Sequence, residues 1–463
     1  MIVVILVIGF LLRILNLNQS LWLDEAINVV SVSKLNYYDL VTKYALGDFH
    51  PPLFHPILKF WISIFGNSEI SVRMPSVLFG VGAIYVTYLI AREVASKKLA
   101  YLAAFFMAIA PYEIYFSQEA RMYSMEGFLG LLTGYLFLKI LKEEKFLYFL
   151  GFTLLMILAV YVDYFGFFLP LIYIFYCVYE KKIGLLKKIF VSFGVTFIVW
   201  LLWLPFFIKQ FANAVETTKS LPGWAAVVGD NSIKNFLLTF VKFSIGRIHF
   251  DNKVLYGLFV LPILVLFGYL SILGFKYIKR KWSTYLAIFF WLPVVVSFLI
   301  SFFYPIYQPF RLLYVLPILY IFLAGGVLSF GGVKRKVLFL LVGLVCLGGV
   351  FIYNYFPRYH REDWRSAVAA VEEIEEGGDL VVFTSYEVMK PWIYYQKGGI
   401  EGVGSSEYEK IDGAKRVFLV RYLWPVFDPE DKVRGRVEDE FLLVDEKDFN
   451  GVFWQLYVRD EKN

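Results

Sequence analysis

Runs of apolar residues, separated by short charged segments, fill this 463-residue chain as far as residue 353. About eleven of them approach the roughly 20 residues that an α-helix needs to cross a bilayer. They start near Met1, Ser71, Leu99, Met122, Phe146, Tyr164, Ile189, Val254, Thr284, Leu312 and Val337. The pattern predicts an α-helical polytopic membrane protein with about eleven transmembrane helices.

The last part of the chain has a different pattern. Apolar residues recur at helical spacing over Glu362–Glu376, and Gly377 and Gly378 follow. Four short β-type runs are predicted: Leu380–Phe383, Val417–Val420, Phe441–Val444 and Val452–Val458. The sequence therefore predicts two domains, a transmembrane domain over residues 1–353 and a soluble α/β domain over residues 354–463.

Composition supports a lipid environment, since 59% of the residues are apolar and the mean hydropathy is +0.63. The net charge of +6 is unevenly divided, with the basic excess confined to the transmembrane part. Cys177 and Cys346 both lie inside apolar runs, where cysteine is typical of a packed core rather than of a disulfide or a metal site.

Basic residues mark alternate connections between the predicted spans. These connections hold Arg92, Lys97, Lys98; Lys142, Lys145; Lys181, Lys182, Lys187, Lys188; Lys276, Lys279, Arg280, Lys281; and Lys334, Arg335, Lys336. The positive-inside rule makes them cytoplasmic, so we expect a multi-pass cell-membrane protein with a cytoplasmic N-terminus and an extracytoplasmic C-terminal domain. Two outer connections are long, 18–70 and 209–253. Helical spacing over Ile233–Ile245 predicts an interfacial helix in the second.

Polar residues gather on the predicted outer side, where carboxylates and arginines are costly unless they are paired or functional. The candidates are Asp24, Glu25, His50, Arg73, Glu119, Arg121, Tyr123 and Arg311. Each has a plainer explanation. The acidic pair is also typical of a helix cap, and a histidine before two prolines, like His50, is typical of a loop corner. The arginines are also typical of side chains that reach out to lipid headgroups. Glu119 also has two possible ion-pair partners, Arg121 and Arg73.

Several short motifs together resemble a known family. They are Leu-Trp-Leu-Asp-Glu-Ala (Leu21–Ala26), His-Pro-Pro-Leu (His50–Leu53), Phe65–Ser76 and Ser-Gln-Glu-Ala-Arg-Met-Tyr (Ser117–Tyr123). This combination resembles the C-type glycosyltransferases, and more narrowly the superfamily of protein O-mannosyltransferases and lipid A aminoarabinose transferases. A weaker likeness runs through Arg311 and Arg361-Glu-Asp-Trp-Arg365.

The resemblance implies an enzyme that moves a sugar from a polyprenyl (dolichyl or undecaprenyl) phosphate carrier to an extracytoplasmic acceptor. It implies Asp24 as the catalytic base beside Glu25. His50, Arg73, Glu119, Arg121, Tyr123 and Arg311 are then expected around the substrate. No cofactor is expected to be required. Asp24 and Glu25 are ligand types that a divalent cation accepts, but the sequence shows no second set of ligands for one. The partners implied are the lipid-linked donor, an acceptor and the bilayer, with no nucleic acid.

Departures from the family leave the acceptor and the sugar open. His50 stands where the aminoarabinose transferases have lysine, and Phe54-His55 replaces the Gly-Lys that follows this motif in many protein mannosyltransferases. The residue types on the predicted outer side suit the implied reaction. A carboxylate can accept the proton of an acceptor hydroxyl, and arginines can stabilise the departing phosphate. A single displacement would invert the anomeric carbon. The alternatives are a transporter or lipid flippase, and a non-catalytic scaffold.

Overall fold

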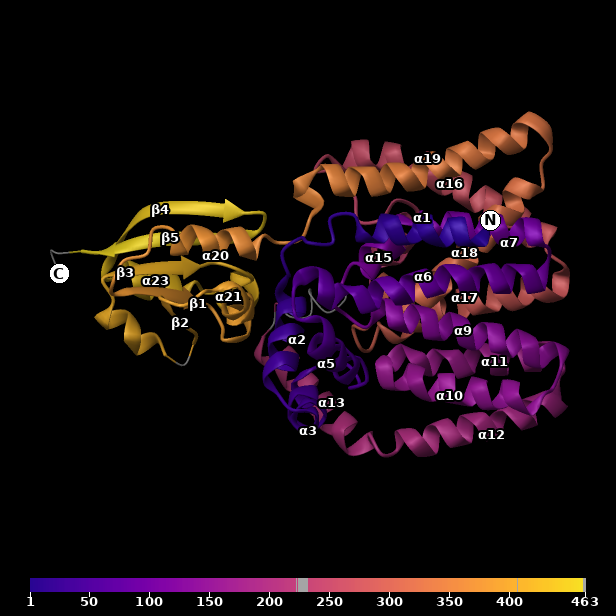
Figure 1. Ribbon diagram of the computed structural model, residues 1–463, viewed down its shortest axis with the longest axis horizontal. Coiled ribbons are helices and arrows are strands. Elements are labelled where there is room, and N and C mark those ends of the chain that lie inside the picture. The colour runs from indigo at the N-terminus through magenta and orange to yellow at the C-terminus, as the bar shows by residue number, and fades with distance from the viewer. Residues whose placement is uncertain (222, 224–231, 406, 461–463) are drawn as a thin grey trace.

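The computed structural model describes residues 1–221, 223, 232–405 and 407–460. It contains a bundle of apolar helices, with a smaller domain built on a β-sheet at one end of the bundle (Figure 1). The bundle consists of α1 (Ile2–Ile14), α6 (Glu69–Val94), α7 (Lys97–Ala108), α8 (Pro111–Ser117), α9 (Tyr123–Lys142), α10 (Phe146–Val162), α11 (Phe168–Tyr179), α12 (Ile183–Trp200), α16 (Lys253–Tyr277), α17 (Arg280–Ile300), α18 (Leu316–Leu328) and α19 (Gly332–Tyr355). The predicted helical membrane architecture is confirmed.

Seven helices among the described residues are long and apolar enough to cross a membrane. An eighth span results if α7 and α8, which meet at a bend of 60°, cross as one. Pro111 begins α8, and a proline there cannot continue the hydrogen bonding of the preceding helix. The three other predicted spans coincide with shorter apolar helices, namely α1, α10 and the segment Tyr164–Tyr179 that contains α11. Each predicted span is thus an apolar helix, while the count of eleven crossings stays a prediction.

Glycines let two of these helices touch backbone to backbone. A Cβ atom added to Gly274 of α16 would lie 1.8 Å from the Phe322 carbonyl oxygen of α18. One added to Gly326 of α18 would lie 2.1 Å from the Leu270 carbonyl oxygen. Small residues at such contacts are typical of helix association in membranes, where dispersion contacts replace the hydrophobic effect. We infer that α16 and α18 cannot pack in this way with larger residues at either glycine.

The five basic connections all lie at one end of the bundle. They join α6 to α7, α9 to α10, α11 to α12, α16 to α17 and α18 to α19. The β-sheet domain lies at the opposite end, and α19 runs from the basic end towards it (Figure 1). This arrangement agrees with the alternation of charge along the sequence. The direction in which the bundle is inserted stays a prediction.

Short helices occupy the two long connections at the end that carries the β-sheet domain. Segment 18–70 contains α2 (Leu23–Lys34), α3 (Tyr37–Asp39), η1 (Leu40–Tyr44), α4 (Ala45–Gly47) and α5 (Phe54–Phe65). Segment 209–253 contains most of α13 (Leu204–Ser220) and all of α15 (Ile233–Ile245). Residues 222 and 224–231 of that segment lie outside the described residues. The helix predicted over Ile233–Ile245 is confirmed, whereas its place at the membrane surface is untested.

The C-terminal domain is α/β, as predicted. Its elements are η4 (Pro357–Tyr359), α20 (Trp364–Glu372), β1 (Asp379–Phe383), η5 (Glu387–Met389), α21 (Lys390–Tyr395), β2 (Glu401–Val403), η6 (Tyr408–Gly413), β3 (Arg416–Val420), α22 (Trp424–Phe427), α23 (Lys432–Glu438), β4 (Phe441–Phe449) and β5 (Val452–Arg459). The five strands pair in the order β2-β1-β3-β5-β4. The pairs of β1 with β2 and β3 are parallel, and those of β5 with β3 and β4 are antiparallel.

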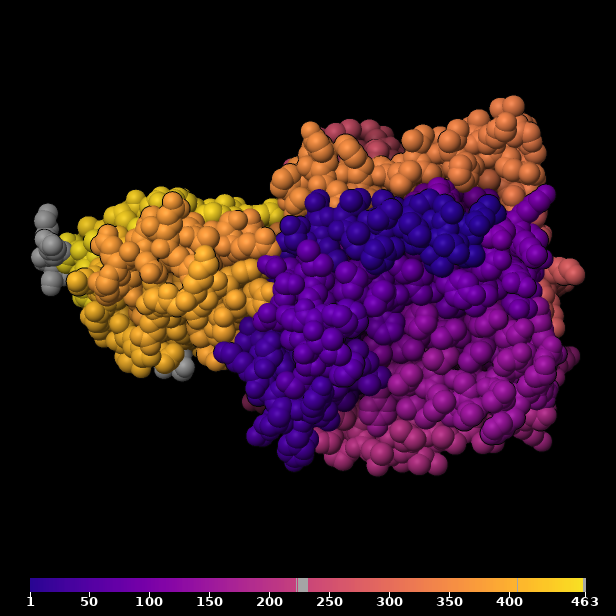
Figure 2. Space-filling model, in the orientation of Figure 1, coloured from indigo at the N-terminus to yellow at the C-terminus, as the bar shows by residue number. Residues whose placement is uncertain are grey.

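Helix α2 links this domain to the bundle. Leu23, at the start of α2, is part of the apolar core of the C-terminal domain together with Trp364 and Trp392. Ala26 and Val29 of the same helix belong to the core of the bundle. Figure 2 shows the C-terminal domain abutting the segment around α2, drawn in indigo to purple. The helix that carries Asp24 and Glu25 is therefore held from both sides.

Candidate active site

Asp24 and Glu25 lie in the first turn of α2, but their side chains have different surroundings. The backbone N–H groups at a helix start are unpaired and favour negative charge, which suits two acids at this place. Glu25 is completely buried, whereas 35% of the Asp24 side chain is exposed. The two adjacent carboxylates are therefore not equivalent.

Glu25 forms a buried ion pair with Arg73 of α6. Arg73 Nε donates to Glu25 Oε1 at 2.8 Å, and Arg73 Nη2 donates to Glu25 Oε2 at 2.5 Å. The Ala120 N–H also donates to Glu25 Oε1 at 2.7 Å. Burial by itself raises the pKa of Glu25, but the Arg73 and Arg361 guanidiniums outweigh burial, so the pKa lies below its ordinary value. Glu25 is thus held ionised inside the protein.

Arg73 has no N–H group left for a ligand. Its remaining three donors are used by the carbonyl oxygens of Leu17 at 2.8 Å, Gln19 at 2.6 Å and Ser20 at 3.0 Å. A guanidinium has five N–H donors in all. The structure therefore does not support the sequence-based expectation that Arg73 contacts the donor. The sequence did not show that the backbone of residues 17–20 takes up this side chain.

Glu119 belongs to the same buried network. Arg361, which precedes α20, donates from Nη1 to Glu119 Oε1 at 2.8 Å and from Nη2 to the Gln118 carbonyl oxygen at 3.0 Å. Burial raises the pKa of Glu119, and the Arg361 charge opposes this only in part. Its partner is neither Arg121 nor Arg73, the two that the sequence suggested. Arg361 thereby fastens the C-terminal domain to the loop between α8 and α9.

Asp24 faces Arg121 at a distance that leaves both side chains available. Arg121 Nη2 lies 3.7 Å from Asp24 Oδ2, and its Nη1 donates a long hydrogen bond of 3.5 Å to Asn28 Oδ1. Arg121 Nε is buried without a partner among the described residues. Burial raises the pKa of Asp24 above the ordinary aspartate value of 3.8, and Arg121 offsets only part of this effect. A carboxylate with a raised pKa is a better proton acceptor.

His50 is buried beside Asp163, a residue that the sequence reasoning missed. His50 Nδ1 lies 3.1 Å from Asp163 Oδ2. Asp163 separates α10 from η2 (Tyr164–Phe167), and its Oδ1 accepts a hydrogen bond of 2.8 Å from the Phe165 N–H. A single acid between two apolar runs can be recognised in the sequence as a candidate functional residue. An ionisable group at a membrane edge is costly unless it is paired or takes part in function.

Arg311 lies on η3 (Pro309–Val315), close to Tyr123. Its Nε is buried without a partner among the described residues, and Nη1 reaches the Ile306 carbonyl oxygen only at 3.4 Å. Its guanidinium also lies over the Phe165 ring, 5.7 Å from the centroid. Tyr123 lies within electrostatic range of Asp24, Arg121 and Arg311.

The structure thus divides the predicted site residues into two groups. The first consists of Asp24, His50, Arg121, Tyr123 and Arg311, joined by Asp163, and includes two arginines with unused N–H groups. The second consists of Glu25, Arg73 and Glu119, joined by Arg361, in which Arg73 has every donor paired. We call these the open cluster and the closed network. In the closed network Glu119 Oε2 also lacks a partner among the described residues, but Arg121 Nε and Arg311 Nε, the arginine donors without a partner, belong to the open cluster.

A metal site at Asp24 and Glu25 is not supported by this geometry. Both carboxylate oxygens of Glu25 accept hydrogen bonds from Arg73, so they are not directed with Asp24 towards one metal ion. Within residues 1–221, 223, 232–405 and 407–460, no group of three or more His, Cys, Asp or Glu side chains is placed to hold a metal ion. The expectation that no cofactor is required remains untested.

Comparisons with known proteins agree with the motifs. A family model described as dolichyl-phosphate-mannose-protein mannosyltransferase matches residues 49–208, a range that includes His50, Arg121 and Asp163. "Putative mannosyltransferase YkcB" of Bacillus subtilis (strain 168) is 25% identical over 166 residues. That alignment covers 32% of this chain and 22% of YkcB, so the chain spans about a fifth of the length of this curated relative.

Solved structures match over nearly the whole chain. ArnT from Cupriavidus metallidurans in the apo state has a TM-score of 0.62 at 12% identity, covering 99% of this chain and 97% of ArnT. The same protein bound to undecaprenyl phosphate gives 0.61 at 11% identity, with the same coverage. The archaeal oligosaccharyltransferase AglB from Archaeoglobus fulgidus, in complex with an inhibitory peptide and a dolichol-phosphate, gives 0.55 at 14% identity, covering 100% of this chain and 74% of AglB. The predicted resemblance is therefore confirmed: the chain is a multi-pass membrane protein with the fold of the C-type glycosyltransferases, and residues 49–208 match the dolichyl-phosphate-mannose-protein mannosyltransferase family.

Proposed function

We propose that this protein transfers a sugar from a polyprenyl phosphate carrier to a hydroxyl acceptor, and that the open cluster is its active site. The proposal rests on two arginines, the buried Arg121 and the partly buried Arg311, whose Nε atoms are buried without a partner among the described residues. Arg121 faces the available carboxylate of Asp24. An unpaired buried donor costs about 1–3 kcal/mol, so it is typical of a site that awaits a ligand. The matches described above include no transporter or flippase.

Asp24 is the proposed general base. As the acceptor oxygen bonds to the anomeric carbon, its proton passes to Asp24, and the bond between that carbon and the phosphate oxygen breaks. The electron pair of the broken bond leaves with the carrier phosphate. One displacement of this kind inverts the anomeric centre. The partial exposure of the Asp24 side chain leaves its carboxylate open to an acceptor hydroxyl.

Arg121 and Arg311 are proposed to hold the carrier phosphate. Guanidinium groups pair with phosphate oxygens through parallel N–H donors, and the interaction is stronger where water is scarce. His50 Nδ1 lies within hydrogen-bond distance of Asp163 Oδ2, so Nε2 is the ring nitrogen left for a ligand. We assign Arg73, Glu25 and Glu119 to the framework instead, because their pairing fixes α2 and the loop before α9.

Loss of either phosphate-binding arginine should weaken donor binding. Arg121→Gln and Arg311→Gln each remove a charge-assisted contact, so we expect the affinity for a polyprenyl phosphate to fall by about 10–100-fold. Binding to detergent-purified protein, measured by thermophoresis with a labelled polyprenyl phosphate, tests this. Arg358→Gln is the matched control, because Arg358 is a partly exposed arginine that pairs with Asp251 outside the cluster. Equal affinities in all four proteins would exclude the arginines from the donor site.

The proposed reaction also requires the open cluster to face away from the cytoplasm. A reporter that is active only outside the cytoplasm should be active when fused after Lys253 or Asn354. The same reporter fused after Lys182 or Lys281 should be inactive, because these residues lie at the basic end of the bundle. The reversed pattern would place the cluster on the cytoplasmic side and contradict transfer to an extracytoplasmic acceptor.

A further inference from the structure

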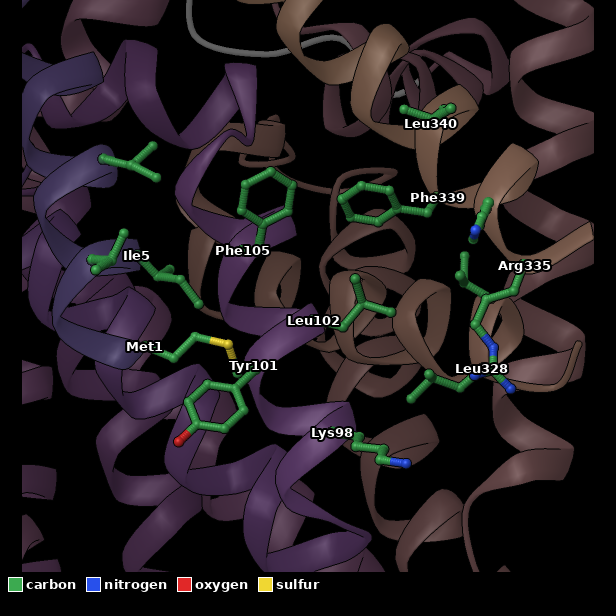
Figure 3. A pocket seen from close by; sticks show the side chains of 14 residues that line it. Met1, Ile5, Lys98, Tyr101, Leu102, Phe105, Leu328, Arg335, Phe339 and Leu340 are labelled. Atoms are coloured by element: carbon green, nitrogen blue, oxygen red, sulfur yellow. The ribbon is translucent and has the colours of Figure 1, made fainter. Parts of the chain in front are cut away.

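A cavity of about 730 Å³ lies at the basic end of the bundle, far from Asp24. Figure 3 shows the side chains that line it, which come from α1, α7, the end of α18 and the start of α19. Phe105 of α7 and Phe339 of α19 touch, with ring centroids 5.6 Å apart. Both α7 and α19 begin at the basic end, so the cavity lies between their first turns.

The lining changes from basic to apolar along two helices. On α7, Lys98 is followed on the same face by Leu102 and Phe105, at the spacing of successive turns. On α19, Arg335 is followed in the same way by Phe339. In Figure 3 the two phenylalanines lie together, apart from the cationic end of Lys98. Such an amphipathic surface matches a molecule that has a charged head and a hydrocarbon tail.

The three basic residues at this cavity are exposed, and no acidic residue of the described chain pairs with them. Within the part of the chain that the structure describes, the Nζ atoms of Lys98 and Lys336 have neither a hydrogen bond nor an ion pair. Arg335 uses its Nε to donate to the Phe330 carbonyl oxygen at 2.6 Å, which leaves both Nη nitrogens. The described lining contains no acidic residue. Three cations without a counter-charge therefore border one apolar space.

We propose that this cavity binds one anionic phospholipid of the bilayer, with its phosphate at Lys98, Arg335 and Lys336 and an acyl chain against Leu102 and Phe105. Basic pockets between transmembrane helices are typical binding places for anionic headgroups. A zwitterionic lipid carries a positive group that these cations repel. The occupant is a bilayer phospholipid and not the sugar donor, because the donor's phosphate must reach Arg121 at the opposite end. The orientation predicted from charge makes it a lipid of the cytoplasmic leaflet.

Native mass spectrometry of the full chain tests the proposal without any need for sugar transfer. Wild-type protein should retain one phosphatidylglycerol at concentrations where phosphatidylcholine does not bind. Lys98→Gln, Arg335→Gln and Lys336→Gln combined should weaken this binding by roughly tenfold or more. The control combines Lys181→Gln, Lys187→Gln and Lys276→Gln, which remove as many charges from the basic end but line no part of the cavity. Equal loss in both triple variants would overturn the site, because the effect would then be one of net charge.

A second variant tests the apolar part. Leu102→Trp fills the cavity and keeps all three cations, so it should also weaken phosphatidylglycerol retention; unchanged retention would overturn the placement of the acyl chain. Polyprenyl phosphate serves as the competing probe. If the first triple variant lost polyprenyl phosphate binding and kept phosphatidylglycerol, the cavity would be a donor site and the proposal would be wrong. An equal preference of the wild type for phosphatidylcholine would likewise contradict it.

Discussion

Asp24→Asn should lower the rate of sugar transfer by about 10²–10⁴-fold, the usual cost of losing a general base. Asparagine keeps the size and the packing of the side chain but accepts a proton poorly. The fold should survive, because among the described residues Asp24 has one ion-pair contact, at 3.7 Å to Arg121, and its side chain is partly exposed. Donor affinity should stay near the wild-type value, since the carrier phosphate is assigned to the arginines. The measurement is transfer from a labelled lipid-phosphate sugar by purified protein, with donor affinity determined in parallel.

Two controls separate base catalysis from a general effect of charge. Asp251→Asn changes an exposed acid that lies outside the open cluster, so transfer should be unaffected. In the wild type, only ionised Asp24 can accept the proton, so the rate should fall as the pH drops through its pKa. Burial raises that pKa above 3.8, which moves the acidic limb of the pH profile upwards, and the limb should disappear in Asp24→Asn. Near-normal transfer by Asp24→Asn would remove Asp24 as the base.

Glu25→Gln should destabilise the protein by about 3–5 kcal/mol, because it leaves the charge of Arg73 buried without a partner. The expected readout is a lower unfolding temperature of the purified protein in detergent. Glu69→Gln is the matched control. Glu69 pairs with Arg365, whose side chain is 45% exposed, and accepts a hydrogen bond from the Tyr395 hydroxyl that glutamine can still accept, so its loss should cost less than about 1 kcal/mol.

Removing both charges distinguishes a framework role from a role in binding. Glu25→Gln combined with Arg73→Met removes the orphaned charge, so the double variant should recover part of the lost stability. Glu25→Gln with wild-type stability but lost donor binding would contradict the framework role and return Glu25 to the active site.

The C-terminal domain is attached to the bundle close to Asp24. Leu23 is buried in the core of that domain and is the neighbour of Asp24. The Leu21 N–H donates to the Tyr395 hydroxyl at 2.7 Å, and Arg361 reaches Glu119 from the same domain. The domain therefore contributes to the position of Asp24, although none of its side chains belongs to the open cluster.

Local patterns in the sequence predicted local structure well. Apolar runs located the bundle helices, and alternation over residues 380–458 located four of the five strands. The missed strand, Glu401–Val403, has only three residues, too few for a periodic signal. In segment 18–70, α3 and α4 were missed because they have three residues each, and α2 because packing on two domains determines it. The 12 residues of the apolar helix α5 did carry a helical signal, but they are too few to cross a bilayer and were not assigned a helix.

Pairing across long separations could not be read from the sequence. Arg73 and Arg121 are the same residue type in similar motifs, yet one is fully paired and the other is not. What separates them is the backbone of residues 17–20 and the carboxylate of Glu25, which only the fold brings to Arg73. The partnership of Glu119 with Arg361, 242 positions away, is equally invisible in one sequence. The motifs thus predicted candidate residues, whereas only the fold shows what each one faces.

The most direct test follows the sugar and its carrier together. Purified protein in liposomes would receive polyprenyl-phosphate-linked sugars with a labelled sugar, together with membrane extract from cells that lack this protein as the source of acceptor. Mass spectrometry would count free polyprenyl phosphate and new glycoside, with a nucleotide sugar as the comparison donor. We expect one released carrier phosphate for each glycoside, formed with inverted configuration, and no product from the nucleotide sugar. Product from the nucleotide sugar, or lipid-linked sugar that merely changes leaflet without cleavage, would contradict it.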